Sequence, residues 1–145
     1  MNTKATIKAE TAERIEFLTD CLVGAVEHHR YGWFDVDEWE PSEDGTAYAL
    51  VTEQDEEQAQ HRLDLDTVRK GLQVIRDAKL ADIDAGVCGV DQVLANAETG
   101  ERLYLAERYW ETIAEADREN DATEIDVVLA LAIVECGLFG QVRYA

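Results

Sequence analysis

The stretch VVLALAIVEC, residues 127–136, indicates how this chain folds, because it is apolar on every side of a helix. A helix of this kind has to be covered by other elements all round, so it is predicted to be the most buried one. Thr123 and Asp126 stand at the spacing of an N-terminal capping box. Gly137 can end the helix in the left-handed conformation.

The elements that cover this helix are predicted from hydrophobic periodicity. Apolar residues recur at helical spacing in four further segments: residues 11–29, the segment that follows an N-cap at Asp66, residues 91–97 as a short helix, and residues 102–118. Residues 1–10 show no such pattern and are expected to be a loose lead-in.

Aromatic and β-branched runs predict a small antiparallel sheet. Residues 31–40 and 46–51 are separated by Pro, Ser, Asp and Gly, which is typical of a hairpin. The segment HRLDL at 61–65 predicts a third strand, and LFGQVRYA at 138–145 predicts a C-terminal strand with Val142 and Tyr144 on one face. We therefore expect one α+β domain over residues 1–145, with this sheet packed on four or five helices.

The composition limits the classes of function. The chain has 145 residues and a formal net charge of −19, from 32 acidic residues against 13 Lys and Arg. Residues 1–72 hold 17 acidic and 7 basic residues and residues 73–145 hold 15 and 6, so the charge is not an acidic tail. A surface of this sign repels phosphates, which disfavours direct binding to nucleic acid or to anionic membranes. Basic proteins or cations are the expected partners.

Cofactor chemistry has weak support in the sequence. Cys21, Cys88 and Cys136 are far apart and lie in apolar contexts, so they are expected to pack as small hydrophobes in a reducing cytoplasm. No metal or other cofactor is expected, because neither the histidines nor the DIDAG segment at 82–86 completes a ligand set. There is no apolar run of membrane-spanning length. A homo-oligomer is left open.

The strongest local signal is a run of carboxylates without a cation. Between Tyr31 and His61 there are ten acidic residues and no Lys or Arg. On a regular strand Asp35 and Asp37 would share a face about 6.6–6.8 Å apart, a spacing similar to that of successive phosphates, with Phe34 turned to the core. The candidate partner-binding residues are Asp35, Asp37, Glu38, Glu40, Glu43, Asp44, Glu53, Asp55, Glu56 and Glu57.

Two other interpretations of the same residues stay open at this level. Acidity with only four Lys against nine Arg is also typical of adaptation to high salt, where charge keeps a chain soluble without any specific partner. Alternatively, a pair drawn from Asp35, Asp37, Glu38 and Glu40, beside Trp33, could serve a small hydrolase as acid and base. No nucleophile or phosphate-binding motif supports an enzyme.

The sequence also resembles a family of small acidic proteins encoded by phages, plasmids and integrated elements of high-GC microbes. The resemblance rests on RENDATEIDVVLALAIVECGLFGQVRYA at 118–145, on the aromatic segment at 31–33 and on LDLDTVRKGL at 63–72. It implies a mobile-element context, in which small acidic proteins often inhibit host defence. It carries over no functional residue.

These observations together favour a non-enzymatic accessory or inhibitor protein. It would bind a basic protein, such as a nucleic-acid-binding host protein, through the carboxylate-rich hairpin in the manner of a nucleic-acid mimic.

Overall fold

The structure is a computed structural model that describes residues 10–27, 33–55, 57–84 and 90–144. Within these residues there are four helices, α1 (Ala12–Glu27), α2 (Leu65–Asp77), α3 (Glu107–Glu119) and α4 (Val127–Phe139). The strands are β1 (Phe34–Glu40), β2 (Tyr48–Glu53), β3 (Gln60–Asp64), β4 (Lys79–Asp84) and β5 (Val90–Ala95). The predicted α+β class is confirmed. The predicted lead-in, residues 1–10, lies almost wholly outside the described residues.

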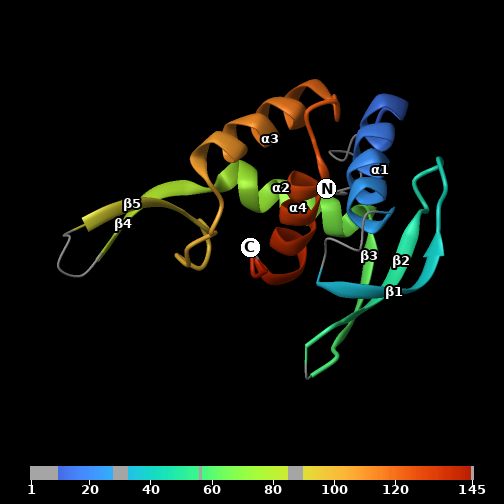
Figure 1. Cartoon of the computed structure of the whole chain (residues 1–145). Coiled ribbons are helices and arrows are strands. Elements are labelled where there is room, and N and C mark those ends of the chain that lie inside the picture. The colour runs from blue at the N-terminus through green and yellow to red at the C-terminus, as the bar shows by residue number, and fades with distance from the viewer. Residues whose placement is uncertain (1–9, 28–32, 56, 85–89, 145) are drawn as a thin grey trace, which may run out of the picture.

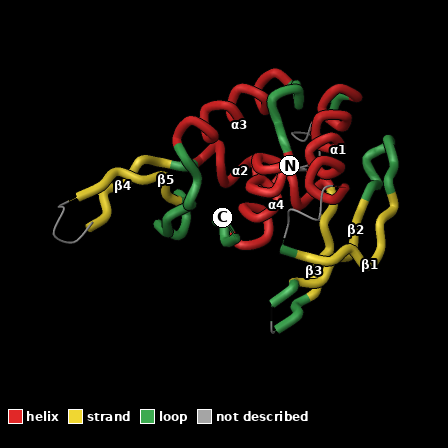
Figure 2. The backbone as a smooth tube through the Cα atoms, viewed as in Figure 1, coloured by secondary structure: helices red, strands yellow, loops and turns green. Residues whose placement is uncertain are grey.

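The elements form layers that can be followed in Figure 1 and Figure 2. The antiparallel sheet β1–β2–β3 stands on one side, α1, α2 and α4 occupy the middle, and α3 lies on the far side. The inner face of the sheet buries Phe34, Ala49, Val51 and Leu63 against the helices. The predicted hairpin and third strand are therefore confirmed.

Helix α4 is the centre of the core, as its apolar sequence predicts. Residues 129–136 are all buried. Its N-cap is Asp126, whose side chain accepts a hydrogen bond from the Leu129 backbone N–H, while Thr123 bonds to Asp121 instead of completing a capping box. The helix also continues past Gly137 and ends at Gly140, which has φ 75°.

Gly137 instead allows the backbones of α4 and α2 to approach closely where the two helices cross. A Cβ atom built on Gly71 would lie 1.9 Å from the Ile133 carbonyl oxygen, and one on Gly137 would lie 2.1 Å from the Thr67 carbonyl oxygen. The two backbones therefore approach more closely than any side chain would allow. Glycine is required at both positions by this contact.

Helix α3 is connected to α1 and α2 by one buried carboxylate. Asp117 forms ion pairs with Arg14 of α1 at 2.7 Å and with Arg76 of α2 at 2.9 Å. The Arg14 guanidinium also donates to the carbonyl oxygen of Asp117 and to Asn120. Removing a helix from this arrangement would leave a charge unpaired.

The region 79–95 differs from the prediction. Instead of a short helix at 91–97, β5 pairs antiparallel with β4 and forms a second, two-stranded sheet, with Leu80 opposite Leu94. This hairpin projects away from the helices (Figure 1). The helix prediction was wrong because pairing with another strand, whose partners here lie between six and sixteen residues away, is not visible in the hydrophobic period of one segment.

Two helix starts also differ from the prediction. The N-cap of α2 is Asp64, which with Thr67 makes a reciprocal capping box, so the helix begins before Asp66. Helix α3 begins at Glu107 instead of Arg102. Leu103, predicted in the helix, is fully buried in extended backbone, where its N–H donates to the Leu94 carbonyl.

The predicted C-terminal strand is absent from the described residues. The Val142 N–H donates to the Leu103 carbonyl, and the N–H groups of Arg143 and Tyr144 both donate to Oε1 of Glu135. These backbone donors are taken by the Glu135 side chain and by the residues before α3. Residues 142–144 therefore do not pair with a strand.

The cysteines fit their predicted role where they are described. Cys21 and Cys136 are buried and free, and burial raises the pKa of each thiol to about 12. Thiols with such pKa values remain protonated and unreactive at neutral pH. Cys88, His28 and His29 lie outside the described residues.

Candidate functional site

The candidate site is the outer face of the β1–β2–β3 sheet, turned away from the helices. Asp35, Asp37, Glu38 and Glu40 of β1 are all exposed, and we call these four residues the acidic face. Asp35 pairs with Thr52, Glu38 with Leu50 and Glu40 with Tyr48, which are the outward positions of β2. The structure thus brings four of the predicted residues together on one strand.

A β-bulge explains why four acids fit on one side of a seven-residue strand. The pairing with β2 shifts between Val36 and Glu38, so Asp37 is an extra residue without a direct partner. On a regular strand Glu38 would turn inward with Val36. The bulge instead returns Glu38 to the outer face and turns Trp39 toward the core. It also ends the regular alternate-residue spacing that was predicted for Asp35 and Asp37.

Neutral groups of β2 and of the residue after it hold three of these four carboxylates in place, those of Asp35, Asp37 and Glu38. Thr52 Oγ1 donates to Asp37 at 2.5 Å, and Tyr48 O–H donates to Glu38 at 2.8 Å. Gln54 Nε2 donates to Asp35 at 3.1 Å. Hydroxyl and amide donors orient a carboxylate without cancelling its charge, so the acidic face is both ordered and negative.

A single cation lies on this outer face within the described part of β1, β2 and β3. Arg62 of β3 lies opposite Leu50, with its guanidinium 4.2 Å from the centre of the Tyr48 ring and 3.1 Å from Asp64. Its charge is therefore shared with Asp64 at the edge away from β1. The β1 carboxylates keep their net negative charge.

The candidate residues of the first loop are exposed beside the acidic face. Glu43 and Asp44 lie between β1 and β2. Asp44 accepts hydrogen bonds from Ser42 and Thr46, and these bonds lower the pKa of its carboxyl group. Because an Asx-type turn holds Asp44, this carboxylate stays ionised and fixed.

The candidate residues after β2 are arranged less simply. Glu57 is exposed, Asp55 is half-buried, and Glu56 lies outside the described residues. Asp55 accepts from the Glu57 N–H and from the Tyr144 hydroxyl at 3.2 Å. These acids border the C-terminal segment and do not continue the row on β1.

Glu53 corrects the prediction that all ten carboxylates face outward. Glu53 is the last residue of β2, and it is only 3% exposed. Its carboxylate accepts from the Tyr144 hydroxyl and contacts His61 Nε2 at 2.9 Å, with the Arg143 guanidinium 3.9 Å away. These hydrogen bonds, that from Tyr144 foremost, lower the pKa of Glu53. Glu53 is a structural residue that ties β2 and β3 to the C-terminal segment.

Acidic residues also gather elsewhere on the described surface. Glu115 and Glu119 of α3, with Asp121 and Glu124 after it, line a shallow hollow. Unlike β1, helix α3 also carries Arg108 and Arg118. Exposed acidic residues are therefore spread over the molecule. The acidic face differs from the other acidic regions because neutral donors hold its carboxylates and because few cations lie near it.

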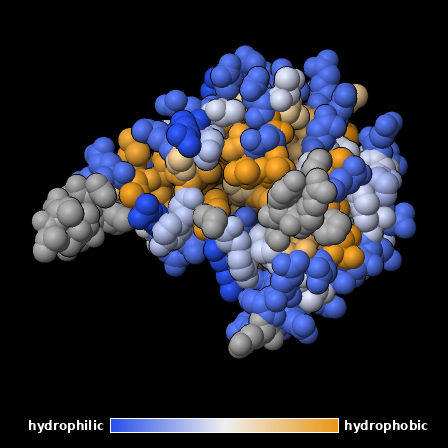
Figure 3. All heavy atoms as spheres, in the orientation of Figure 1, coloured by the Kyte–Doolittle hydropathy of each residue, from blue (hydrophilic) through white to orange (hydrophobic). Residues whose placement is uncertain are grey.

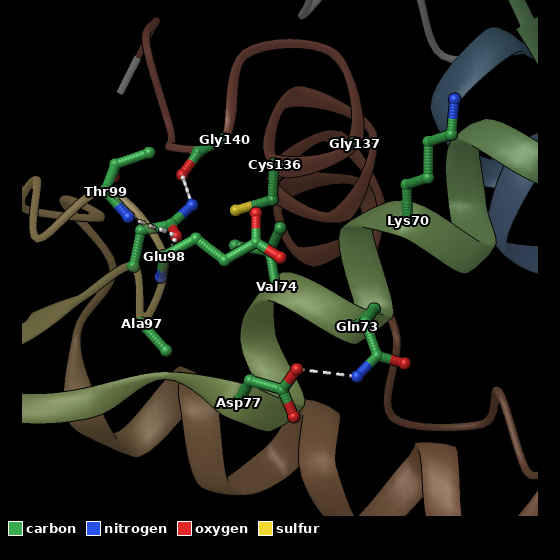
Figure 4. Close-up of a pocket in the computed structure, with 11 residues that line it drawn as sticks. Lys70, Gln73, Val74, Asp77, Ala97, Glu98, Thr99, Cys136, Gly137 and Gly140 are labelled. Atoms are coloured by element: carbon green, nitrogen blue, oxygen red, sulfur yellow. Dashed lines mark hydrogen bonds between the residues drawn. The ribbon is translucent and has the colours of Figure 1, made fainter.

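A hollow of another kind lies elsewhere on the described surface. This pocket of about 340 Å³ lies between α2, the residues after β5 and the end of α4, and the Glu98 side chain reaches toward Val74 and Cys136 in it (Figure 4). Gln73 on its wall donates a hydrogen bond to Asp77. Among the described residues there is no group of three or more His, Cys, Asp and Glu placed to hold a metal ion.

Comparison with known proteins adds no family to this description. No family model, no curated protein and no solved structure matches the chain. In the described residues, no helix is both long enough and apolar enough to cross a membrane. Function has to be argued from the site itself.

Proposed function

We propose that this chain is a non-enzymatic protein that binds a basic protein through the acidic face. The observation that carries the proposal is the row of four exposed carboxylates on β1, three of which are held by neutral donors of the neighbouring residues. The natural partner of such a surface is a nucleic-acid-binding groove, because fixed anions on a rigid sheet satisfy the same cations as phosphates do. The resemblance noted above supports an accessory or inhibitor role in a phage or plasmid.

The proposed mechanism is competition. A net charge of −19 draws a basic partner in and raises the association rate, while the ordered carboxylates determine which surface it meets. Once the groove of the partner is covered, nucleic acid is displaced. The same charge keeps this chain itself away from nucleic acid.

The other two interpretations fare differently. An acid pair for hydrolysis needs at least one carboxyl group in a cleft with altered surroundings, but Asp35, Asp37, Glu38 and Glu40 are all exposed on the open face of the sheet. Salt adaptation stays a second candidate, because acids on α3 are as exposed as those on β1. A melting temperature that falls steeply at low salt and recovers in molar salt would favour it.

The first prediction compares two variants of equal charge. The face variant is Asp35→Asn, Asp37→Asn, Glu38→Gln and Glu40→Gln; the control variant is Glu111→Gln, Glu115→Gln, Glu119→Gln and Glu124→Gln on and after α3. We expect the face variant to bind a basic protein captured from lysate at low salt at least about tenfold more weakly, because local charge is lost. The control variant should lose much less.

Affinity is measured against salt concentration, with duplex DNA added as a competitor. The intact chain should bind more weakly as salt rises and should be released by DNA. An equal loss of affinity in the two variants would show that only the net charge of the chain matters and not the position of the carboxylates. An affinity independent of salt would contradict the electrostatic mechanism.

A further inference from the structure

A mostly apolar pocket lies between the start of α3, helix α4 and the C-terminal segment, away from the acidic face. It encloses about 480 Å³. Trp33 and Tyr144 are stacked 4.9 Å apart as one of its walls, and Tyr109 and Leu131 contribute to the others. Figure 3 shows apolar side chains gathered on this side of the molecule, between α3 and α4. A cavity of this size accommodates a small organic group.

The polar groups of the pocket include a buried acid. Glu135 of α4 lines the pocket and is 2% exposed, and one of its oxygens accepts from the N–H groups of Tyr144 at 2.6 Å and Arg143 at 3.0 Å. Burial raises the pKa of its carboxyl group, while these two N–H donors and the nearby Trp33 side chain favour the ionised form. In the described part of the chain no Lys, Arg or His forms an ion pair with it. A buried acid on a cavity wall without a cation is an unusual and costly arrangement.

A second polar group, the Trp33 indole N–H, lies on the same wall. The Trp33 indole Nε1 is buried and has no partner that meets hydrogen-bond geometry. The ring lies close to Glu135, so the N–H adds to the polar end of an otherwise apolar cavity. Buried polar atoms without a well-formed hydrogen bond are rare in folded proteins.

The rim of the pocket is also exposed and apolar. Tyr104 is 54% exposed and Val128 is 56% exposed, and both line the opening. Tyr104 has φ 59°, a left-handed conformation that is uncommon outside glycine and that concentrates at functional sites. The rings at the opening attract cations: the guanidinium of Arg102 lies 4.8 Å from the Tyr104 ring centre, and that of Arg108 lies 4.7 Å from the ring of Tyr109.

From this geometry we infer that the pocket binds an alkylammonium group, the chemistry of a lysine side chain or of a free aliphatic amine. The apolar walls cover the alkyl stem, and Glu135 supplies the counter-charge of the ammonium group. This inference goes beyond the proposed function and does not depend on it, because none of the acidic-face residues lines the pocket.

The test uses protonated n-pentylamine as the probe, with 1-pentanol as a neutral ligand of similar shape. Binding is followed by calorimetry and by the NMR signal of the Trp33 indole N–H. We expect the amine to bind and to shift that signal, and pentanol to bind at least about tenfold more weakly, since a charged hydrogen bond is lost. Equal binding of amine and alcohol, or no binding of the amine, would overturn the inference.

Variants identify the group that recognises the charge. Glu135→Gln retains an oxygen for the two backbone N–H groups and should fold, yet it should lose the preference for the amine. Glu111→Gln, exposed on α3, is the matched control and should retain it. Val128→Trp at the exposed rim should weaken both ligands by blocking the opening. An unchanged preference in Glu135→Gln would contradict the role of the carboxylate.

A short peptide with one central lysine and blocked ends distinguishes the two sources of the group. Binding of this peptide would assign the pocket to a lysine of a protein partner. If only the free amine enters, the pocket takes a small molecule. The acidic-face variant should bind n-pentylamine normally, so failure of this inference and failure of the proposed function can be told apart.

Discussion

Replacing Gly71 with alanine is expected to lower the free energy of unfolding by at least about 3 kcal/mol, since the new methyl group meets backbone atoms that no rotamer change can move. The added Cβ would lie 1.9 Å from the Ile133 carbonyl oxygen and 2.8 Å from its carbon. To relieve this contact α2 and α4 must separate, and α4 is the centre of the core. The loss is measured by urea unfolding.

Gly24→Ala is the matched control for this substitution. Gly24 lies in helix α1, and an added Cβ there would meet the Ala130 Cβ at 3.4 Å, an ordinary contact. Alanine favours the helical backbone, so this variant should be unchanged or more stable by up to about 1 kcal/mol. If the Gly71→Ala protein had the same free energy of unfolding as the Gly24→Ala protein, this would contradict the close crossing of α2 and α4.

Replacing Glu53 with glutamine is expected to cost about 1–3 kcal/mol at pH 7, because the buried carboxylate loses its charge toward His61 and its strong bond from Tyr144. The cost should depend on pH. The pKa of Glu53 is lowered in the folded state, so its contribution is present above its ordinary value of 4.5 and is lost as pH falls through the lower folded value. The intact protein should therefore approach the variant in stability at low pH.

The measurement is urea unfolding of both proteins at pH 7 and near pH 3. Glu57→Gln is the control, since Glu57 is exposed near the same turn and should change stability by less than about 0.5 kcal/mol at either pH. A difference between Glu53→Gln and the intact protein that stays constant with pH would contradict the assignment of Glu53 as a buried, ionised link.

Elements with a strong local sequence pattern could be predicted. The hairpin of β1 and β2 follows from aromatic and β-branched runs around a Pro and Gly turn, and α4 follows from its uniformly apolar sequence. Both depend on local propensity and on the period of hydrophobic residues. The outward direction of Asp35 and the burial of Phe34 follow from strand alternation alone.

The features that were missed depend on specific partners that the hydrophobic pattern of a single segment does not reveal. Whether residues 90–95 form a strand depends on residues 79–84, and whether residues 141–144 join a sheet depends on Glu135. A capping aspartate two residues from the predicted one moved the start of α2. In each case a specific side chain or partner strand overrode local propensity.

The candidate site was predicted in part for the same reason. The four β1 acids lie together as expected. The bulge that turns Glu38 outward was not predicted, because no sequence pattern indicated it. Glu53 was predicted among the partner-binding carboxylates because nothing near it in the sequence indicates its partner Tyr144. Glu135 looked like one polar residue in an apolar helix, and only the fold brings it beside Trp33 at the aromatic pocket.

The central claim is that the ordered carboxylates of β1, and not the general acidity, recognise a basic partner. The most direct measurement is an NMR titration of the labelled protein with a basic peptide of ten arginines at low salt. The account predicts that shift changes concentrate on β1 and on the facing residues Tyr48, Thr52 and Gln54, and that the face variant loses them. Changes spread over α3 and β1 alike, in proportion to exposed charge, would contradict it.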